Sequence, residues 1–190
     1  MCIDMKKIGF LGGTFDPIHN GHVEIAKIAA DSLGLDKVFF IPAALPPHKE
    51  GNYAENGMHR LNMAYLAAEE DKRFEVTDYE FKREGKSYSY LTMEHFKELY
   101  ADSTLYFILG DEAYAALDSW KHPERLKKVV EFIVVNRENI EFSGNVHSIK
   151  IQPIEISSTK IRALIKENKD AGSYLPPKVY DYILKNNLYR

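Results

Sequence analysis

A chain of 190 residues is long enough to bury one α/β core and short for two, so we expect a single domain over residues 1–190. With 45% hydrophobic and 28% charged residues, its composition argues against disorder and against a fibrous repeat. The formal charge of -3 offers no general attraction to nucleic acid, and no apolar stretch approaches the roughly 18 residues of a membrane span. We therefore expect neither a nucleic-acid partner nor a membrane association.

Cysteine usage bears on the cellular compartment. The single cysteine, Cys2, cannot form an internal disulfide and is expected to be a free thiol. Free thiols are typical of reducing compartments, so we expect the protein in the cytoplasm. A homo-oligomer is possible, but the sequence does not decide it, because any interface would be a patch assembled from distant segments.

The first third of the chain predicts a βα unit, then a strand and a long loop. An apolar run at 6–11 stops at two glycines, and apolar residues at helical spacing follow at 20–33. A second apolar run at 38–41 stops at a proline and leads into a loop rich in Pro, Gly and Asn. Long ordered loops are usually functional, so we expect residues 42–57 to cover a substrate.

Strands and helices continue to alternate over the rest of the chain. The remaining expected strands are at 74–76 with a continuation toward 81, and at 104–109, 129–135 and 149–151. The remaining expected helices are at 58–70, from a cap at Ser89 to residue 100, around Trp120, and at 158–166 and 177–186. This alternation predicts an α/β fold, a Rossmann-like doubly wound parallel sheet with helices on both faces. Its ligand is expected beyond the carboxyl ends of the strands, where the strand order reverses.

The segment GGTFDPIHNGH at 12–22 joins the first strand to the first helix and predicts a phosphate-binding loop. Glycines let the backbone approach an anion, and the helix start supplies unpaired N–H groups and a positive dipole end. His19 and His22 are three residues apart, so on one helical turn they face the same way. The segment matches neither a Walker loop nor the GxGxxG fingerprint. Taken alone, two histidines at a helix start are equally compatible with surface or capping residues.

The segment ISSTKIR at 156–162 is a second candidate for phosphate binding. Hydroxyls and amides at a helix N-terminus suit an anion, and Arg162, about one turn later, can add a charge-assisted fork. Alone the segment is an ordinary N-cap, whereas two such helix starts in one chain favour a phosphate site. No Cys, Asp or Glu stands at customary zinc-ligand spacing near the histidines, so a metal held by the protein is not expected.

These two segments belong to a longer series that carries a family resemblance. The series is GGTFDPIHNGH at 12–22, IPAALPPHK at 41–49, SYSYLTM at 87–93, FILGDE at 107–112, ISSTKIR at 156–162 and YLPPKVYDYI at 174–183, with Arg60, Met63 and Trp120. Across this series of segments, the chain resembles the bacterial nicotinate-nucleotide adenylyltransferases of the HxGH nucleotidyltransferase superfamily. Ser89 and Leu91 depart from the Thr and Asp that the family often has at these positions.

The resemblance implies an enzyme of NAD biosynthesis that binds ATP and nicotinate mononucleotide. The phosphate of the mononucleotide would attack the α-phosphorus of ATP in line, giving nicotinate adenine dinucleotide and pyrophosphate without a covalent enzyme intermediate. It implies that His19, His22 and Arg162 are catalytic and that Mg²⁺ is held mainly by the ATP phosphates. The ATP-binding residues that it implies are Gly12, Gly13, Thr14, Phe15, His19, His22, Gly110, Asp111, Ile156, Ser158, Thr159 and Arg162.

For the acceptor, the resemblance implies that Trp120 stacks on the pyridine ring, with core packing as the alternative role of this only tryptophan. The other substrate-binding residues that it implies are Lys49, Ser87, Tyr88 and Thr92. Asp111 would contact ribose hydroxyls, since a carboxylate accepts two such bonds. The resemblance favours nicotinate over its amide, although the sequence does not place the donors that would decide between them.

Three other functions share part of this sequence pattern. A pantetheine-phosphate adenylyltransferase would share both phosphate segments and should lack the LPPHK loop and the Trp120 region. A nucleotide sensor would keep the site but lose the histidines or Arg162, and none of these is lost. A tRNA-binding role, suggested by HxGH, would need a basic stripe that the sequence lacks.

Overall fold

The protein is built on one parallel sheet. The computed structural model describes residues 6–47, 56–136, 144–152 and 155–190. Its six strands are β1 (Lys7–Gly13), β2 (Lys37–Pro42), β3 (Phe74–Val76), β4 (Thr104–Gly110), β5 (Glu131–Asn136) and β6 (Val146–Lys150). Every pairing is parallel, and the strand order is β3-β2-β1-β4-β5-β6. This is the doubly wound order, so the expected fold class is confirmed, and the order reverses between β1 and β4.

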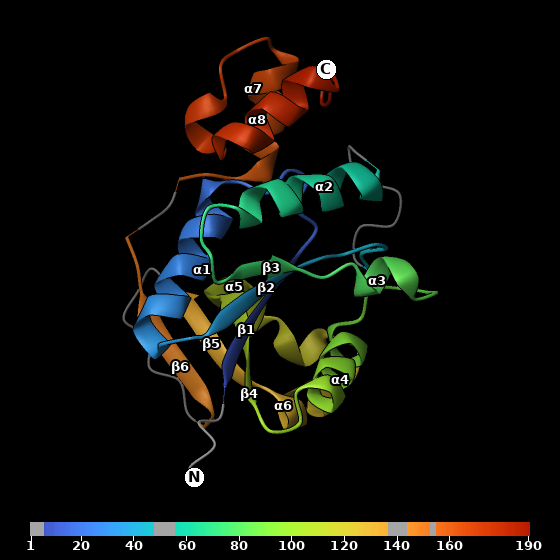
Figure 1. Cartoon of the computed structure of the whole chain (residues 1–190), viewed down its shortest axis with the longest axis vertical. Coiled ribbons are helices and arrows are strands. Elements are labelled where there is room, and N and C mark those ends of the chain that lie inside the picture. The colour runs from blue at the N-terminus through green and yellow to red at the C-terminus, as the bar shows by residue number, and fades with distance from the viewer. Residues whose placement is uncertain (1–5, 48–55, 137–143, 153–154) are drawn as a thin grey trace.

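Helices cover both faces of the sheet (Figure 1). They are α1 (Asn20–Leu33), α2 (Gly57–Ala68), α3 (Tyr79–Lys82), α4 (Ser89–Leu99), α5 (Asp111–Ala115), α6 (Pro123–Val129), α7 (Ser158–Lys166) and α8 (Pro177–Lys185), with 3-10 turns η1 (Leu117–Ser119) and η2 (Gly172–Tyr174). In Figure 1, α7 and α8 lie beside α2 at the end of the molecule opposite the N-terminus.

The two faces of the sheet have separate apolar cores because side chains alternate along each strand. On β4, Tyr106 and Ile108 belong to the core that α1, α2, α7 and α8 complete. Their neighbours Phe107 and Leu109 belong to the opposite core, under α4 and α6. Strands buried on both faces read as continuous apolar runs, which is why β4 and β5 were recognisable from sequence.

Three sequence predictions need correction. The strand expected from 74 toward 81 ends at Val76, because the chain turns at Asp78 into the short helix α3. Trp120 follows η1 rather than lying within a helix, because the chain bends between η1 and the start of α6 at Pro123. Ser89 is the first helical residue of α4; Tyr88 takes the N-cap position and makes no side-chain cap bond.

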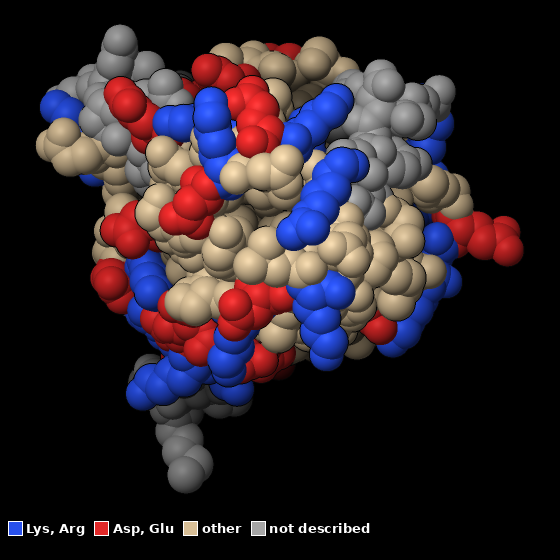
Figure 2. Space-filling model, turned by 90° about the horizontal axis from the view of Figure 1, so that it is seen from above, with Lys and Arg blue, Asp and Glu red and all other residues tan. Residues whose placement is uncertain are grey.

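The surface is mixed in charge on the face seen from above. Figure 2 shows Lys and Arg side chains interspersed with Asp and Glu there. Such interspersed charges give no continuous basic stripe on that face. Within the described ranges, no helix combines the length and the apolar content that crossing a bilayer requires.

Candidate active site

The loop that leaves β1 is shaped by a glycine and a buried aromatic ring. A Cβ on Gly13 would lie 2.7 Å from the ring of Phe15, so only glycine fits there without displacing the ring. Phe15 has a left-handed backbone (φ 52°), and its buried ring packs edge-on against His22 and Phe40. The Phe15 ring therefore lies in the core, whereas Gly12, Gly13 and Thr14 line a cavity. The loop of residues 12–19 is called the glycine loop below.

His19 and His22 stand together at the start of α1. Their ring centroids are 3.8 Å apart, with 31° between the planes. The backbone N–H of His19 donates to Nδ1 of His22 at 3.2 Å. Because Nδ1 of His22 accepts this bond, the proton of the neutral ring sits on Nε2, which can donate to a ligand.

Both imidazoles are neutral at pH 7. Burial lowers the pKa of His19 to about 4. Burial also lowers the pKa of His22 well below 6.5, and the neighbouring His19 lowers it further. Nδ1 of His19 has no hydrogen-bond partner among the described residues, although it is buried. An anion brought close to this pair would favour the protonated forms and supply the missing partner.

The start of α7 docks directly on this loop, from far along the chain. The hydroxyl of Ser158 donates to the carbonyl of Pro17 at 3.0 Å, and Nη1 of Arg162 donates to the carbonyl of Asp16 at 2.7 Å. Nη2 of Arg162 also donates to the Thr159 hydroxyl at 3.4 Å. The structure thus brings the two predicted phosphate segments together, with two helix N-termini meeting at one loop.

Some predicted ATP-binding residues have local roles that the sequence did not indicate. Ser157, and not Ser158, caps α7 by accepting a bond from the backbone of Lys160 at 3.2 Å. Ile156 is partly buried against the core. At the end of β4, Asp111 already accepts a bond from the backbone of Glu112 at 2.9 Å. Contact of these residues with ATP stays a prediction.

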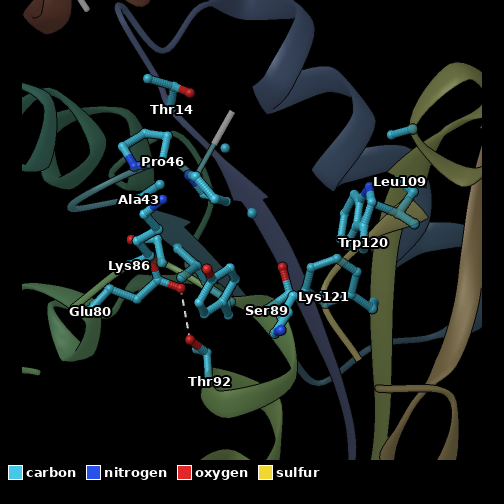
Figure 3. A pocket seen from close by; sticks show the side chains of 18 of the residues that line it. Thr14, Ala43, Pro46, Glu80, Lys86, Ser89, Thr92, Leu109, Trp120 and Lys121 are labelled. Carbon is cyan, nitrogen blue, oxygen red and sulfur yellow. Dashed lines mark hydrogen bonds between the residues drawn. The ribbon is translucent and has the colours of Figure 1, made fainter. Parts of the chain in front are cut away.

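A cavity of about 530 Å³ opens beside the glycine loop. It is lined by Gly12, Gly13, Thr14, Ile41, Ala43, Pro46, Pro47, Glu80, Lys86, Ser87, Tyr88, Ser89, Thr92, Phe107, Leu109, Ala113, Ser119, Trp120 and Lys121. Figure 3 shows Ala43, Pro46, Lys86 and Glu80 on one side of it and Leu109 and Trp120 on the other. Four of the predicted acceptor residues, Ser87, Tyr88, Thr92 and Trp120, therefore share this cavity with the glycine loop. The histidines, Arg162 and Asp111 lie outside its lining.

The acceptor residues are held in different ways. Trp120 is partly exposed and meets Phe107 edge-on at 6.3 Å, which leaves its ring available to the cavity. Ser87 is tied to Leu45 by two bonds, in which its N–H donates and its hydroxyl accepts. Thr92 is fully buried, and its hydroxyl donates to Glu80 at 2.7 Å. Lys49 and most of the loop expected to cover the substrate lie outside the described residues.

The chain is similar to known proteins along nearly its whole length. The cytidylyltransferase-like family model matches residues 10–164. A probable nicotinate-nucleotide adenylyltransferase of Clostridium botulinum (strain Langeland) is 39% identical over 196 residues, covering 95% of this chain and 97% of the relative. The protein of that name from Clostridium tetani is 38% identical over 200 residues, covering 98% and 100%. This chain belongs to the nicotinate-nucleotide adenylyltransferase family.

Solved structures support the fold of this nicotinate-nucleotide adenylyltransferase family member. Nicotinic acid mononucleotide adenylyltransferase of Plasmodium falciparum, complexed with NaAD, superposes with a TM-score of 0.80 over 97% of each chain at 24% identity. The same enzyme complexed with APC gives a TM-score of 0.79. At this identity the likeness concerns the fold.

Two buried charged residues of this family member were not recognised as site residues. Arg60, on α2, is fully buried and donates to the carbonyls of Thr14 (2.7 Å), Ala43 (2.6 Å) and Ala44 (3.2 Å). It therefore joins the glycine loop to the loop after β2. The sequence feature that could have identified Arg60 is its place on the apolar face of an amphipathic helix, one turn before Ala64.

Glu80 is the second such residue. It is 5% exposed, and only one of its oxygens, Oε1, has a hydrogen-bond partner among the described residues, the Thr92 hydroxyl. Burial raises the pKa of the Glu80 carboxyl, although the nearby Ser87 and Thr92 side chains act in the opposite direction. Glu80 is thus a buried carboxyl in the lining of the cavity. No sequence pattern distinguished this glutamate from a surface one.

Proposed function

We propose that this enzyme transfers the AMP part of ATP to the phosphate of nicotinate mononucleotide, making nicotinate adenine dinucleotide and releasing pyrophosphate. The observation that carries the proposal is the position of the cavity. It is large enough for a mononucleotide and reaches the glycine loop on which two helix N-termini converge. An acceptor in the cavity would thus direct its phosphate toward a triphosphate held by the loop.

The chemical step needs positioning and charge stabilisation rather than a protein nucleophile. An oxygen of the acceptor phosphate attacks the α-phosphorus of ATP, and the bond from that phosphorus to the pyrophosphate oxygen breaks. His22 would donate from Nε2 to a phosphate oxygen on which charge develops, with His19 beside it. Because both rings are neutral before ATP binds, they supply hydrogen bonds first and gain protons only as the anion arrives.

The leaving group would be held by the start of α7. Ser158, Thr159 and Arg162 would bind the β- and γ-phosphates through hydroxyls, backbone N–H groups and the guanidinium. Gly12, Gly13, Thr14 and Phe15 would present backbone groups to the reacting phosphates. Gly110 and Asp111, at the end of β4, would contact ribose hydroxyls.

Mg²⁺ would be carried mainly by the phosphates of ATP, where it neutralises charge on the pyrophosphate that leaves. The donors of the described loop fit this arrangement. Its one carboxylate, Asp16, is buried and accepts a hydrogen bond from the Tyr189 hydroxyl at 2.9 Å. The protein groups around the ion would therefore act on the phosphates rather than on the metal.

The acceptor would lie along the cavity with its ring on Trp120. The partly exposed indole offers a flat apolar surface, and Ser87, Tyr88 and Thr92 line the same cavity. Lys49 would add a cation from the loop after β2. We further infer that the enzyme works in the cytoplasm as a single-domain protein on small molecules alone.

The test is pyrophosphate release from MgATP by the purified protein with three acceptors supplied separately. Nicotinate mononucleotide should give the highest kcat/KM, above nicotinamide mononucleotide, and phosphopantetheine should give none. Activity with phosphopantetheine alone would contradict the assignment of the cavity. Tight binding of ATP and mononucleotide without product would indicate a sensor instead.

A further inference from the structure

Charged side chains are few in the cavity and unequal in character. Among its described lining residues, the only charged types are Glu80, Lys86 and Lys121. Glu80 is buried, and its Oε1 accepts a hydrogen bond from the Thr92 hydroxyl. Both lysines are exposed. The cavity therefore presents positive charge to whatever enters it, and this favours acceptors that carry more than one anionic group.

Among the described residues, no hydrogen bond or ion pair engages the ammonium group of Lys121. Nearby cations on the same connection are engaged: Arg125 donates to Glu94 at 2.7 Å, and Lys127 to Asp118 at 2.6 Å. Lys121 lines the cavity and is available to a ligand, whereas Arg125 and Lys127 are held in ion pairs with Glu94 and Asp118.

The backbone that carries Lys121 is held firmly against α4. His122, the next residue, has a left-handed backbone (φ 51°), and its ring meets Tyr90 of α4 edge-on at 5.0 Å. The guanidinium of Arg125 lies over the same Tyr90 ring at 4.5 Å. These contacts fix the start of the lysine side chain, so less conformational freedom is lost when its ammonium meets an anion.

The Lys121 side chain extends toward the place where the proposed function puts the pyridine ring of the acceptor. Lys121 directly follows Trp120, and in Figure 3 it extends from the indole side of the cavity toward Ser89. Lys86 lies on the other side, beside Ala43 and Glu80. If the pyridine ring stacks on Trp120, a substituent of that ring is within the range of Lys121 and away from Lys86.

We propose that Lys121 is a specificity-determining residue that selects an acceptor with a carboxylate on its pyridine ring over the corresponding amide. The inference rests on the proposed function. The ammonium donates a charge-assisted hydrogen bond to the carboxylate, whereas a neutral amide gains little from it and leaves the lysine charge uncompensated. The carboxylate thus supplies a partner that Lys121 does not find among the described residues.

The experiment compares kcat/KM for nicotinate and nicotinamide mononucleotide at saturating MgATP. In Lys121→Met, kcat/KM for the acid should fall about tenfold and that for the amide should change by less than about twofold, as expected for loss of one charge-assisted bond. Lys121→Arg should retain most of the preference for the acid. Lys128→Met, an exposed lysine of α6 outside this cavity, should leave both values unchanged.

The ratio of the two values separates specificity from a structural role, because a loss of packing would lower both by the same factor. An unchanged acid-to-amide ratio in Lys121→Met overturns the inference, as does a fall in that ratio for Lys86→Met alone. If the wild-type enzyme turns over neither pyridine mononucleotide, the proposed function itself fails. If wild type makes the dinucleotide and only the ratio test fails, the proposed function stands without a role for Lys121.

Discussion

The phosphate region and the acceptor cavity are built on different plans. The phosphate region consists of one loop and the starts of α1 and α7 that meet at it, and it offers mainly backbone groups and two adjacent imidazoles. The cavity is assembled from the ends of β1, β2 and β4, the connection before α4 and the segment around Trp120. Phosphates are alike in all nucleotides, so a short local motif suffices, whereas discrimination between acceptors needs side chains from several segments.

The two regions also differ in charge. The histidines are neutral until an anion arrives, because burial depresses their pKa values. The lining of the cavity instead includes two exposed lysines, Lys86 and Lys121. This comparison predicts that substitutions in the phosphate region reduce the rate with any acceptor, and that substitutions in the cavity change the response to one substrate.

Arg60 is the residue that joins the two regions, and its loss should have the largest effect. Arg60→Met would remove the donors to the carbonyls of Thr14, Ala43 and Ala44. We expect the free energy of unfolding to fall by about 3 kcal/mol and KM to rise for both substrates, measured by urea titration and steady-state kinetics. Arg60→Lys, which keeps one donor, should show the same changes in weaker form.

Arg73→Met is the matched control, since Arg73 pairs with Asp71 and Asp31 at the other end of the sheet. It should cost about 1 kcal/mol and leave both KM values unchanged. Should Arg60→Met raise KM for one substrate only, the arginine would not link the regions.

His22 tests the phosphate region alone. His22→Ala should lower kcat by about 10² with little change in KM for the acceptor, because its Nε2 donor is expected to act on charge that develops in the transition state. His147→Ala, on the far strand β6 where His147 pairs with Glu131 at 2.7 Å, is the histidine control and should retain kcat. A near-normal kcat in His22→Ala would remove this residue from the chemistry.

Trp120 tests the cavity alone. Trp120→Ala should raise KM for nicotinate mononucleotide about tenfold and leave KM for ATP unchanged, because a stacking surface is lost on one side only. Trp120→Phe should recover part of the affinity, since an aromatic surface remains. Equal losses for both substrates, together with lower stability, would instead assign Trp120 to packing against Phe107.

The smallest effect concerns pH and stability. Burial lowers the pKa of His19 from 6.5 to about 4, so below pH 6.5 the unfolded chain binds a proton that the folded protein does not. Its contribution to stability is therefore present above pH 6.5 and lost as pH falls toward 4, with about 1 kcal/mol lost between pH 7.5 and 5.5. Urea titrations should show a shallower pH dependence in His19→Gln than in wild type. Identical slopes would show that His19 is not the group responsible.

Local patterns were sufficient for most elements but not for connections. The bounds of α1 and α7 agree with the expected helices at 20–33 and 158–166, because apolar spacing and polar helix starts are both local signals. The short helix α3 and the break before Trp120 were missed, because turn geometry there depends on packing against α4 and the sheet. Whether the chain is one domain stays a prediction.

The sequence by itself determined the alternating α/β order, the two phosphate segments and the family resemblance, because each depends on residues close together in the chain. Only the tertiary structure decided that these two segments touch, that Arg60 and Glu80 are buried beside the cavity, and that Lys121 lines it. Burial and pairing of a charged side chain depend on distant segments brought together by the sheet. Composition and spacing contain no measure of that proximity.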